Sequence, residues 1–200
     1  ASKLVEKGED TGDAMLAFLN ESEEDSALTS RALWVLARLG DEGRKVVEAH
    51  LDDEKGEQAH VVAYRALRLA DPIGLIKRAA ESARSRFLSV RREVAVSLKP
   101  FPFEDCSDIL LELIDSYDGS NRYYLEALGV AFSGKEDEVF RELVSPRYPV
   151  PAMWSAKVRN LAWRLYTPEA IRGLDICIRS QKPPVDEFRL LAMAFASFRN

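Results

Sequence analysis

The sequence has few of the residues that build metal centres and disulfide frameworks, with two cysteines and two histidines among 200 residues. Cys106 and Cys177 lie two repeats apart in the pattern described below, which corresponds to ~20 Å across two helix layers and exceeds disulfide reach. Cys177 falls on an apolar stripe, which predicts a buried side chain. Cys106 falls near a helix start, which can lower a thiol pKa, but we expect a structural role rather than a reactive one. His50 and His60 have no cysteine nearby and no carboxylate at a suitable spacing. We therefore expect no metal site.

Motifs for catalysis and cofactor binding are also missing. The sequence contains no CxxC, CxxCH, HExxH or glycine-rich phosphate loop. Its acidic clusters, at residues 23–25, 52–54 and 136–138, coincide with turns and helix starts, where capping and the helix dipole favour acids. We accordingly expect no catalytic residues and no bound cofactor, and we predict that the chain is not an enzyme.

No segment shows the alternating pattern of a β-strand together with strong turn chemistry. Proline and glycine instead separate helix-length segments, as at Asp71-Pro72, Ser133-Gly134 and Thr167-Pro168. The sequence thus predicts an all-α protein.

An apolar landmark residue followed by a turn recurs along the chain at steps of 30, 32, 31, 33 and 33 residues. A fixed period in this range is typical of stacked helical hairpins. Three and seven residues before each landmark lie further apolar or small residues, which share one helix face. The landmarks are Leu39, Leu69, Phe101, Phe132, Leu165 and Phe198.

The period predicts a single HEAT-like repeat domain over residues 1–200, an α-solenoid of about five hairpins in a right-handed superhelix. Its approximate repeats are 1–25 (partial), 26–55, 56–86, 87–118, 119–149, 150–183 and 184–200 (partial). The predicted core contains Leu36, Leu39, Val62, Leu69, Leu98, Leu125, Leu128, Leu161 and Leu165.

Both ends of the sequence carry apolar helical patterns without a polar cap. Residues 13–19 fit a second helix, and residues 186–198 fit a first helix that lacks its partner. The pattern predicts an internal segment of a longer protein, in which Phe195 and Phe198 promote self-association through the C-terminal helix. No membrane-spanning stretch occurs in the sequence.

The net charge of −5 argues against general nucleic-acid binding. Basic residues nevertheless cluster between residues 77 and 92, where Glu81 is the single acid. This cluster fits either a solvated face with internal charge pairs or a docking patch for an acidic partner. The candidate partner-binding arginines are Arg78, Arg84, Arg86, Arg91 and Arg92.

Aromatic residues concentrate between residues 117 and 166. Most fall on core positions of helices, but tyrosine and tryptophan are also common at protein interfaces. The candidates for an exposed recognition surface are Tyr123, Tyr148 and Trp154. A second candidate surface is the face of the second helices, with Lys45, Glu48, Lys77, Glu81, Glu112, Asp115, Arg141 and Arg172.

Two stretches resemble short HEAT-type repeats: RALWVLARLGD, at residues 31–41, and RREVAVSL, at residues 91–98. In addition, YDGSNRYYLEALGVAFSGKEDEVF, at residues 117–140, resembles large secreted planctomycete-type proteins, a family of putative membrane-bound dehydrogenases. Those proteins combine a sugar-dehydrogenase-like β-propeller, a HEAT-repeat middle region and a c-type haem domain. Neither propeller nor haem motifs occur in this sequence, so the resemblance implies a scaffold between the two modules. It also implies a periplasmic or secreted location.

Two other functions stay open on the sequence. One is a free-standing HEAT module that binds a peptide or protein partner. The other is a HEAT-like DNA glycosylase, in which the arginine cluster and Trp154 would converge with a catalytic carboxylate. The acidic overall charge disfavours the DNA-binding enzyme.

Overall fold

The computed structural model describes Ala17, Leu19 and residues 26–181. Helices joined by turns make up this part of the chain, and no strand occurs in it. The prediction of an all-α protein is confirmed for these residues. The chain divides into two compact units, unit 1 (Ala1–Ser97) and unit 2 (Leu98–Asn200). The prediction of one repeat domain over residues 1–200 stays a prediction.

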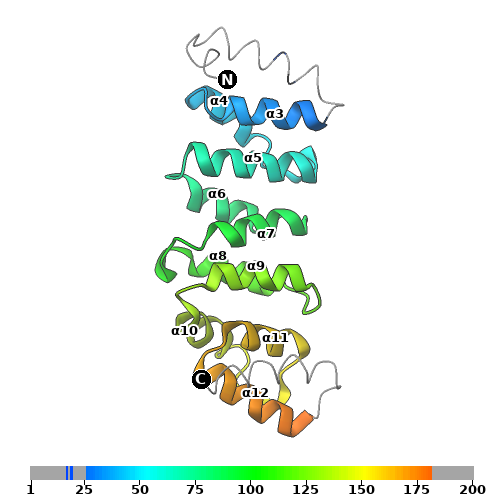
Figure 1. Ribbon diagram of the computed structural model, residues 1–200, viewed down its shortest axis with the longest axis vertical. Coiled ribbons are helices and arrows are strands. Elements are labelled where there is room, and N and C mark those ends of the chain that lie inside the picture. Colours follow the sequence, from blue (N-terminus) through cyan, green and yellow to red (C-terminus); the bar gives the residue numbers. More distant parts are fainter. Residues whose placement is uncertain (1–16, 18, 20–25, 182–200) are drawn as a thin grey trace. The chain divides into compact units, whose positions relative to one another are not determined.

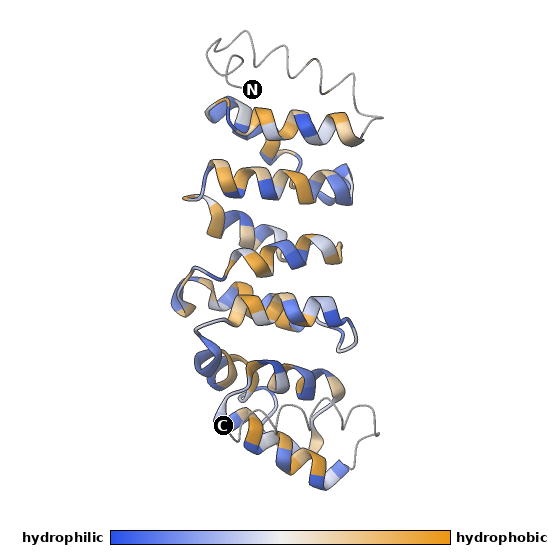
Figure 2. Cartoon of the chain, in the orientation of Figure 1, coloured by the Kyte–Doolittle hydropathy of each residue, from blue (hydrophilic) through white to orange (hydrophobic). Residues whose placement is uncertain are grey.

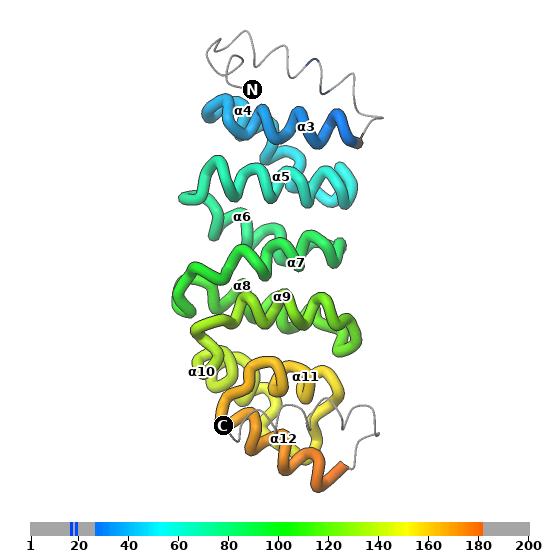
Figure 3. The backbone as a smooth tube through the Cα atoms, in the orientation of Figure 1, coloured from blue at the N-terminus to red at the C-terminus, as the bar shows by residue number. Residues whose placement is uncertain are grey.

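Unit 1 alternates longer first helices with shorter second helices. Helix α5 packs against α3 and α7, and α4 and α6 pack beside it (Figure 1). The backbone reverses direction between consecutive helices, as the tube in Figure 3 shows. The elements are α3 (Ser26–Leu36), α4 (Asp41–Glu48), η1 (Asp53–Lys55), α5 (Glu57–Ala70), α6 (Leu75–Ser82) and α7 (Leu88–Ser97).

Polar side chains join neighbouring first helices of unit 1 at a spacing of about one repeat. The Tyr64 hydroxyl on α5 lies 2.7 Å from Ser97 Oγ on α7, 33 residues later. Ser97 Oγ in turn donates to the Val94 carbonyl, at 2.7 Å. Ser89 donates to Glu57 over 2.6 Å, across 32 residues. These bonds fix the register between α5 and α7.

Unit 2 contains α8 (Phe103–Asp115), α9 (Arg122–Phe132), α10 (Glu136–Glu138), η2 (Val139–Val144), η3 (Pro151–Met153), α11 (Ala156–Leu165) and α12 (Pro168–Gln181). Helix α9 packs against α8 and α11, and α12 packs against α11 and η3. The short α10 runs directly into η2, which is π-helical. The backbone N–H of Ser145 accordingly bonds the Phe140 carbonyl, five residues earlier, at 2.8 Å.

Long-range polar bonds also join the helices of unit 2. Buried Lys135 donates to the Leu98 carbonyl over 3.3 Å. Arg164 on α11 donates to Glu126 on α9 over 3.1 Å, 38 residues apart. Asn160 donates to the Gly119 carbonyl over 2.9 Å. Each bond joins consecutive helical pairs within this unit.

The core lies on the predicted apolar stripes. The residues three and seven positions before each landmark are buried in every repeat between residues 26 and 181. Figure 2 shows hydrophobic and hydrophilic residues interspersed along the helices. The prediction of burial is wrong for two landmarks, since Leu69 is 65% exposed and Leu39 is half-buried. Both leucines lie where a first helix ends and the chain turns away, so neighbouring helices cover them less.

Some sequence expectations fall on residues outside the described part of the chain. These are the C-terminal helix at residues 186–198 with its proposed self-association, and most of the helix at residues 13–19. Of the latter, Ala17 and Leu19 are helical, and Leu19 is buried.

Candidate functional site

In each unit a pocket lies beside the second helices. The unit 1 pocket has a volume of about 710 Å³ and is bordered by α4, η1, α5 and α6. The unit 2 pocket has a volume of about 540 Å³ and is bordered by α10, η2, η3 and α12. Five of the residues that the sequence placed on the second-helix face line these pockets, namely Glu48, Lys77, Glu81, Arg141 and Arg172.

A network of hydrogen bonds around Asp53 forms one wall of the unit 1 pocket. Asp53 Oδ1 accepts from His60 Nδ1 at 3.0 Å and from the Ser85 hydroxyl, while Oδ2 accepts from the Arg86 backbone N–H at 2.7 Å. His60 Nε2 lies 3.2 Å from Ser82 Oγ. Asp53 therefore ties the turn that precedes α5 to the turn that follows α6, about 32 residues later.

Burial and hydrogen bonding set the protonation states in this network. Partial burial acts to raise the pKa of Asp53, but the bonds from Ser85, Arg86 and His60 together outweigh it and lower this pKa below its ordinary value. Burial lowers the pKa of His60, and the attraction to Asp53 compensates only in part. At neutral pH the wall thus holds a carboxylate and a neutral imidazole.

The hydrogen bonds run from Asp53 through His60 to Ser82, as they do in an Asp-His-Ser catalytic triad. Ser82 is buried and does not line the pocket. It also ends α6, and the negative end of a helix disfavours an oxyanion. These positions favour a structural role. Sequence reasoning missed the network, for which the only signal was the one-repeat spacing of Asp53 and Ser85.

Arg78 is the second polar anchor of unit 1. Its side chain is 6% exposed and lies 3.0 Å from both Glu48 and Asp71. The carboxylates come from α4 and from the α5–α6 turn, so the guanidinium joins three segments. The bond from Arg78 is the main cause that lowers the pKa of Asp71.

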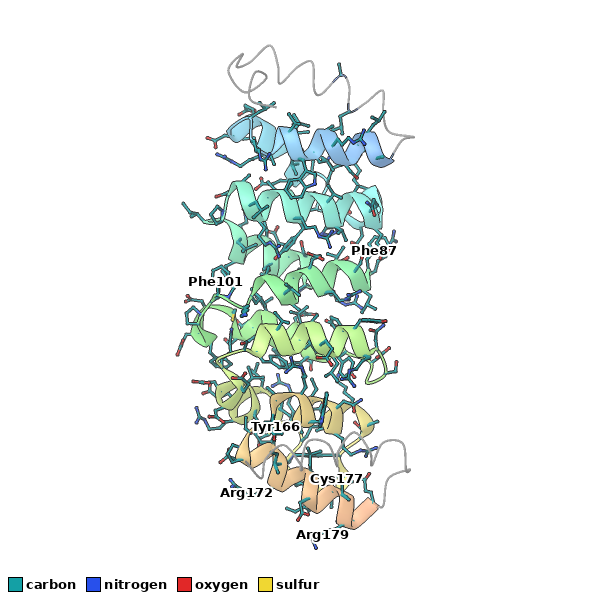
Figure 4. The ribbon with its side chains drawn as sticks, viewed as in Figure 1. Phe87, Phe101, Tyr166, Arg172, Cys177 and Arg179 are labelled. Carbon is teal, nitrogen blue, oxygen red and sulfur yellow. The ribbon has the colours of Figure 1, made fainter. Side chains whose placement is uncertain are left out.

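Most of the candidate arginines between residues 77 and 92 form hydrogen bonds with groups inside unit 1. Arg78 is buried, which corrects its assignment to an exposed patch. Arg86 donates to the Asp53 carbonyl over 3.0 Å and lies over the ring of Phe87, which is labelled in Figure 4. Arg91 donates to the Ser85 carbonyl. Exposed Arg84 lines the pocket, and exposed Arg92 lies on α7.

The floor of the unit 2 pocket is aromatic. The Phe140 and Trp154 rings meet edge to face, with centroids 6.2 Å apart. Trp154 Nε1 donates to the Tyr148 carbonyl over 2.9 Å, so the indole is hydrogen-bonded as well as packed. Glycine at position 173 lets α12 approach this ring, because a Cβ there would lie 2.1 Å from the indole. The floor is therefore closely packed from both sides.

Two unusual backbone segments shape the walls of this pocket. The π-helical η2 carries Phe140 and Arg141, and such segments are frequent at functional sites. Tyr166, labelled in Figure 4, ends α11 in the left-handed region with φ of 58°. That conformation is uncommon outside glycine and costs of order 1 kcal/mol. The turn it forms leads to Pro168, Glu169 and Arg172 on the pocket wall.

The aromatic candidates separate into three environments. Trp154 is 3% exposed, which corrects its assignment to an exposed surface, because Phe140 and Gly173 pack on it. Tyr148 is half-buried and lines the pocket. Tyr123 is exposed on α9 and is not a lining residue. The structure thus brings Tyr148 and Trp154 together.

Both cysteines are buried in unit 2 with free thiols. The predicted burial of Cys177 is confirmed. Burial raises the pKa of the Cys106 thiol, which agrees with the structural role expected for this residue.

Comparison of the chain with protein-family models, curated proteins and solved structures gave no match. Within the part of the chain that is described, no helix has the length and apolar character needed to cross a membrane. Nor do three or more metal-ligating side chains come together in that part.

Proposed function

We propose that this chain is a non-catalytic helical scaffold that binds a partner protein through the unit 2 pocket. The observation that carries the proposal is the composition of this pocket. Its floor is aromatic, its rim is built from prolines and an exposed isoleucine, and exposed arginines stand on its two helical walls. A concave apolar surface with few polar groups is typical of binding sites.

The scaffold part of the proposal includes an α-solenoid of about five HEAT-like hairpins. The spacing of polar bonds within each unit supports it. Ser97 follows Tyr64 by 33 residues, and Arg164 follows Glu126 by 38. Bonds between first helices of successive repeats are expected where hairpins stack.

The resemblance to planctomycete-type proteins extends the proposal to neighbouring domains. It predicts that this scaffold lies between a dehydrogenase-like propeller and a c-type haem domain in an exported protein. The extension rests on residues 117–140 alone and stays a prediction. The DNA glycosylase alternative loses support, because Arg78, Arg86 and Arg91 bind groups inside unit 1.

Selection from a random peptide display library tests the proposed function. The 200-residue chain serves as bait, and each enriched peptide is then measured against two variants of α12. Ile176→Asp places a charge in the pocket, whereas Arg179→Glu alters an exposed ion pair outside it. We expect enriched peptides that lose binding to Ile176→Asp and keep it with Arg179→Glu. The proposal is contradicted if the enriched peptides bind the Ile176→Asp variant as tightly as the unmodified chain, or if the selection yields no binders.

A further inference from the structure

We propose that the unit 2 pocket binds an acidic peptide segment that carries one apolar side chain between its carboxylates. The inference rests on the proposed function and deepens it by naming the chemistry of the partner. It concerns a single surface, formed by α10, η2, η3 and α12.

The apolar part of the ligand follows from the rim and floor of the pocket. Pro149, Pro168 and Ile176 are exposed lining residues, while Phe140 and Trp154 close the floor. Proline rings and packed aromatic rings lose little conformational entropy when a ligand covers them. A volume of about 540 Å³ is that of a small-ligand pocket and accommodates one large side chain with adjoining backbone.

The acidic part follows from two arginines that line the pocket from different helices. Arg141 lies on η2 and is 68% exposed, and Arg172 lies on α12 and is 67% exposed. Their ion pairs involve Glu142 and Glu169 of the same helices, which are themselves more than half exposed. Exposed pairs of this kind contribute little, so a carboxylate of a partner can replace them. The planar guanidinium binds carboxylates in a two-pronged geometry.

Two acids also line the pocket, and each lies at a helix start that partly compensates its charge. Asp137 lies in the first turn of α10, and Glu169 lies in the first turn of α12. Unpaired backbone N–H groups at a helix start stabilise carboxylates there. A basic ligand would compete with the helix N-termini for these two carboxylates. An acidic ligand instead contacts the guanidinium groups, which lie one turn further along each helix. The two walls share this arrangement, an acid followed by arginine after four residues and after three.

Fluorescence anisotropy with defined peptides tests the inference. The probe is a fluorescein-labelled peptide of sequence GSEEFEESG, and its comparison peptides are GSQQFQQSG, GSKKFKKSG and GSEEAEESG. We expect the acidic phenylalanine peptide to bind most tightly, with at least about tenfold weaker binding by each of the others, which corresponds to about 1.4 kcal/mol. Binding should weaken steeply towards about 1 M NaCl, where screening acts within about 3 Å.

Matched variants localise the binding. Arg172→Glu should weaken the acidic peptide at least about tenfold, by the same correspondence of about 1.4 kcal/mol. Arg179→Glu makes the same charge change on the same helix, and Figure 4 labels both positions. This control should shift affinity less than twofold. Circular dichroism and a thermal melt verify that both variants are folded.

The outcomes separate this inference from the proposed function. Equal or tighter binding of the neutral or basic phenylalanine peptide, abolished by Ile176→Asp, overturns the acidic preference and leaves a peptide-binding pocket. If Arg172→Glu and Arg179→Glu reduce the affinity for the acidic phenylalanine peptide equally, the peptide responds only to the net charge of the protein. That result also overturns the inference. If no peptide of the panel binds, the inference is wrong, and the library selection decides the proposed function by itself.

Discussion

At the unit 1 pocket Asp53 and Arg78 bind groups of other segments, whereas at the unit 2 pocket Arg141 and Arg172 form ion pairs with neighbours on their own helices. Asp53 bonds with His60 and Ser85, and Arg78 with Glu48 and Asp71, so these groups connect different segments. The ion pair of Arg141 with Glu142 stays within η2, and that of Arg172 with Glu169 stays within α12. Similar alternating helices therefore support a polar structural network in one unit and, in the other, the accessible pocket that we propose as a binding surface.

The largest expected effect is the loss of the unit 2 floor. Trp154→Ala removes a buried indole that packs on Phe140 and Gly173, and it should lower the free energy of unfolding by about 3–5 kcal/mol. Trp163 in the same unit is half-buried, so Trp163→Ala should cost clearly less. Urea unfolding of both variants measures the difference. A smaller loss for Trp154→Ala than for Trp163→Ala would show that the floor is not a packed core.

Removal of the unit 1 anchor should have the next largest effect. Arg78→Ala breaks bonds to Glu48 and Asp71, and hydrogen bonds to charged groups contribute about 1.5–3 kcal/mol each to stability. The exposed neighbour Lys77 provides the control, because surface substitutions stay within about 0.5 kcal/mol. The account of unit 1 fails if the two alanine variants unfold at the same urea concentration.

Acidification should weaken unit 1 through His60. Burial lowers the pKa of His60 in the folded chain, whereas the unfolded histidine has a pKa of about 6.5. The unfolded state therefore binds the proton first, and stability falls as the pH drops below about 6.5. The depressed pKa of Asp53 acts in the same direction near pH 4 and below.

Stability of the unmodified chain and of His60→Gln, followed from pH 7 to pH 5, isolates this contribution. The glutamine cannot titrate, so the variant should lose the pH dependence attributable to position 60. Identical pH slopes for the two proteins would exclude His60 as the titrating group.

Removing the two arginines that line the unit 2 pocket should have the smallest effect on stability. Arg141→Ala and Arg172→Ala should each change the free energy of unfolding by less than about 0.5 kcal/mol, because both side chains are exposed. Binding of the acidic phenylalanine peptide should nevertheless be weakened in both. A large loss of stability in either variant would make these arginines structural, as in unit 1, and would remove the contrast between the units.

The sequence predicted the helices well, because apolar periodicity and turn residues report local geometry directly. It predicted the burial of Leu36, Val62 and Leu161, which lie on helix stripes. It failed for Leu69, since the stripe continues into a helix end that neighbouring helices do not cover fully. The steady 30- to 33-residue period is a property of the sequence, and the helix positions follow it.

The polar sites were harder to predict, because they depend on which side chains face each other across repeats. The arginine cluster reads as one patch in the sequence, yet Arg78 and Arg91 bond with groups inside unit 1. Trp154 reads as a surface aromatic beside prolines, yet Gly173 leaves space for its ring on α12. Contacts that are distant in sequence decide both cases, since Glu48 lies 30 residues from Arg78 and Gly173 lies 19 residues from Trp154.

Nuclear magnetic resonance titration of the isotope-labelled chain with the acidic phenylalanine peptide tests the central claim most directly. It reports binding at both pockets in one experiment. The account predicts amide shifts that saturate together at Phe140, Arg141, Arg172 and Ile176, with no comparable shifts at Asp53 and Arg78. Shifts centred on the unit 1 pocket, or saturation without any shift along η2 and α12, would contradict it.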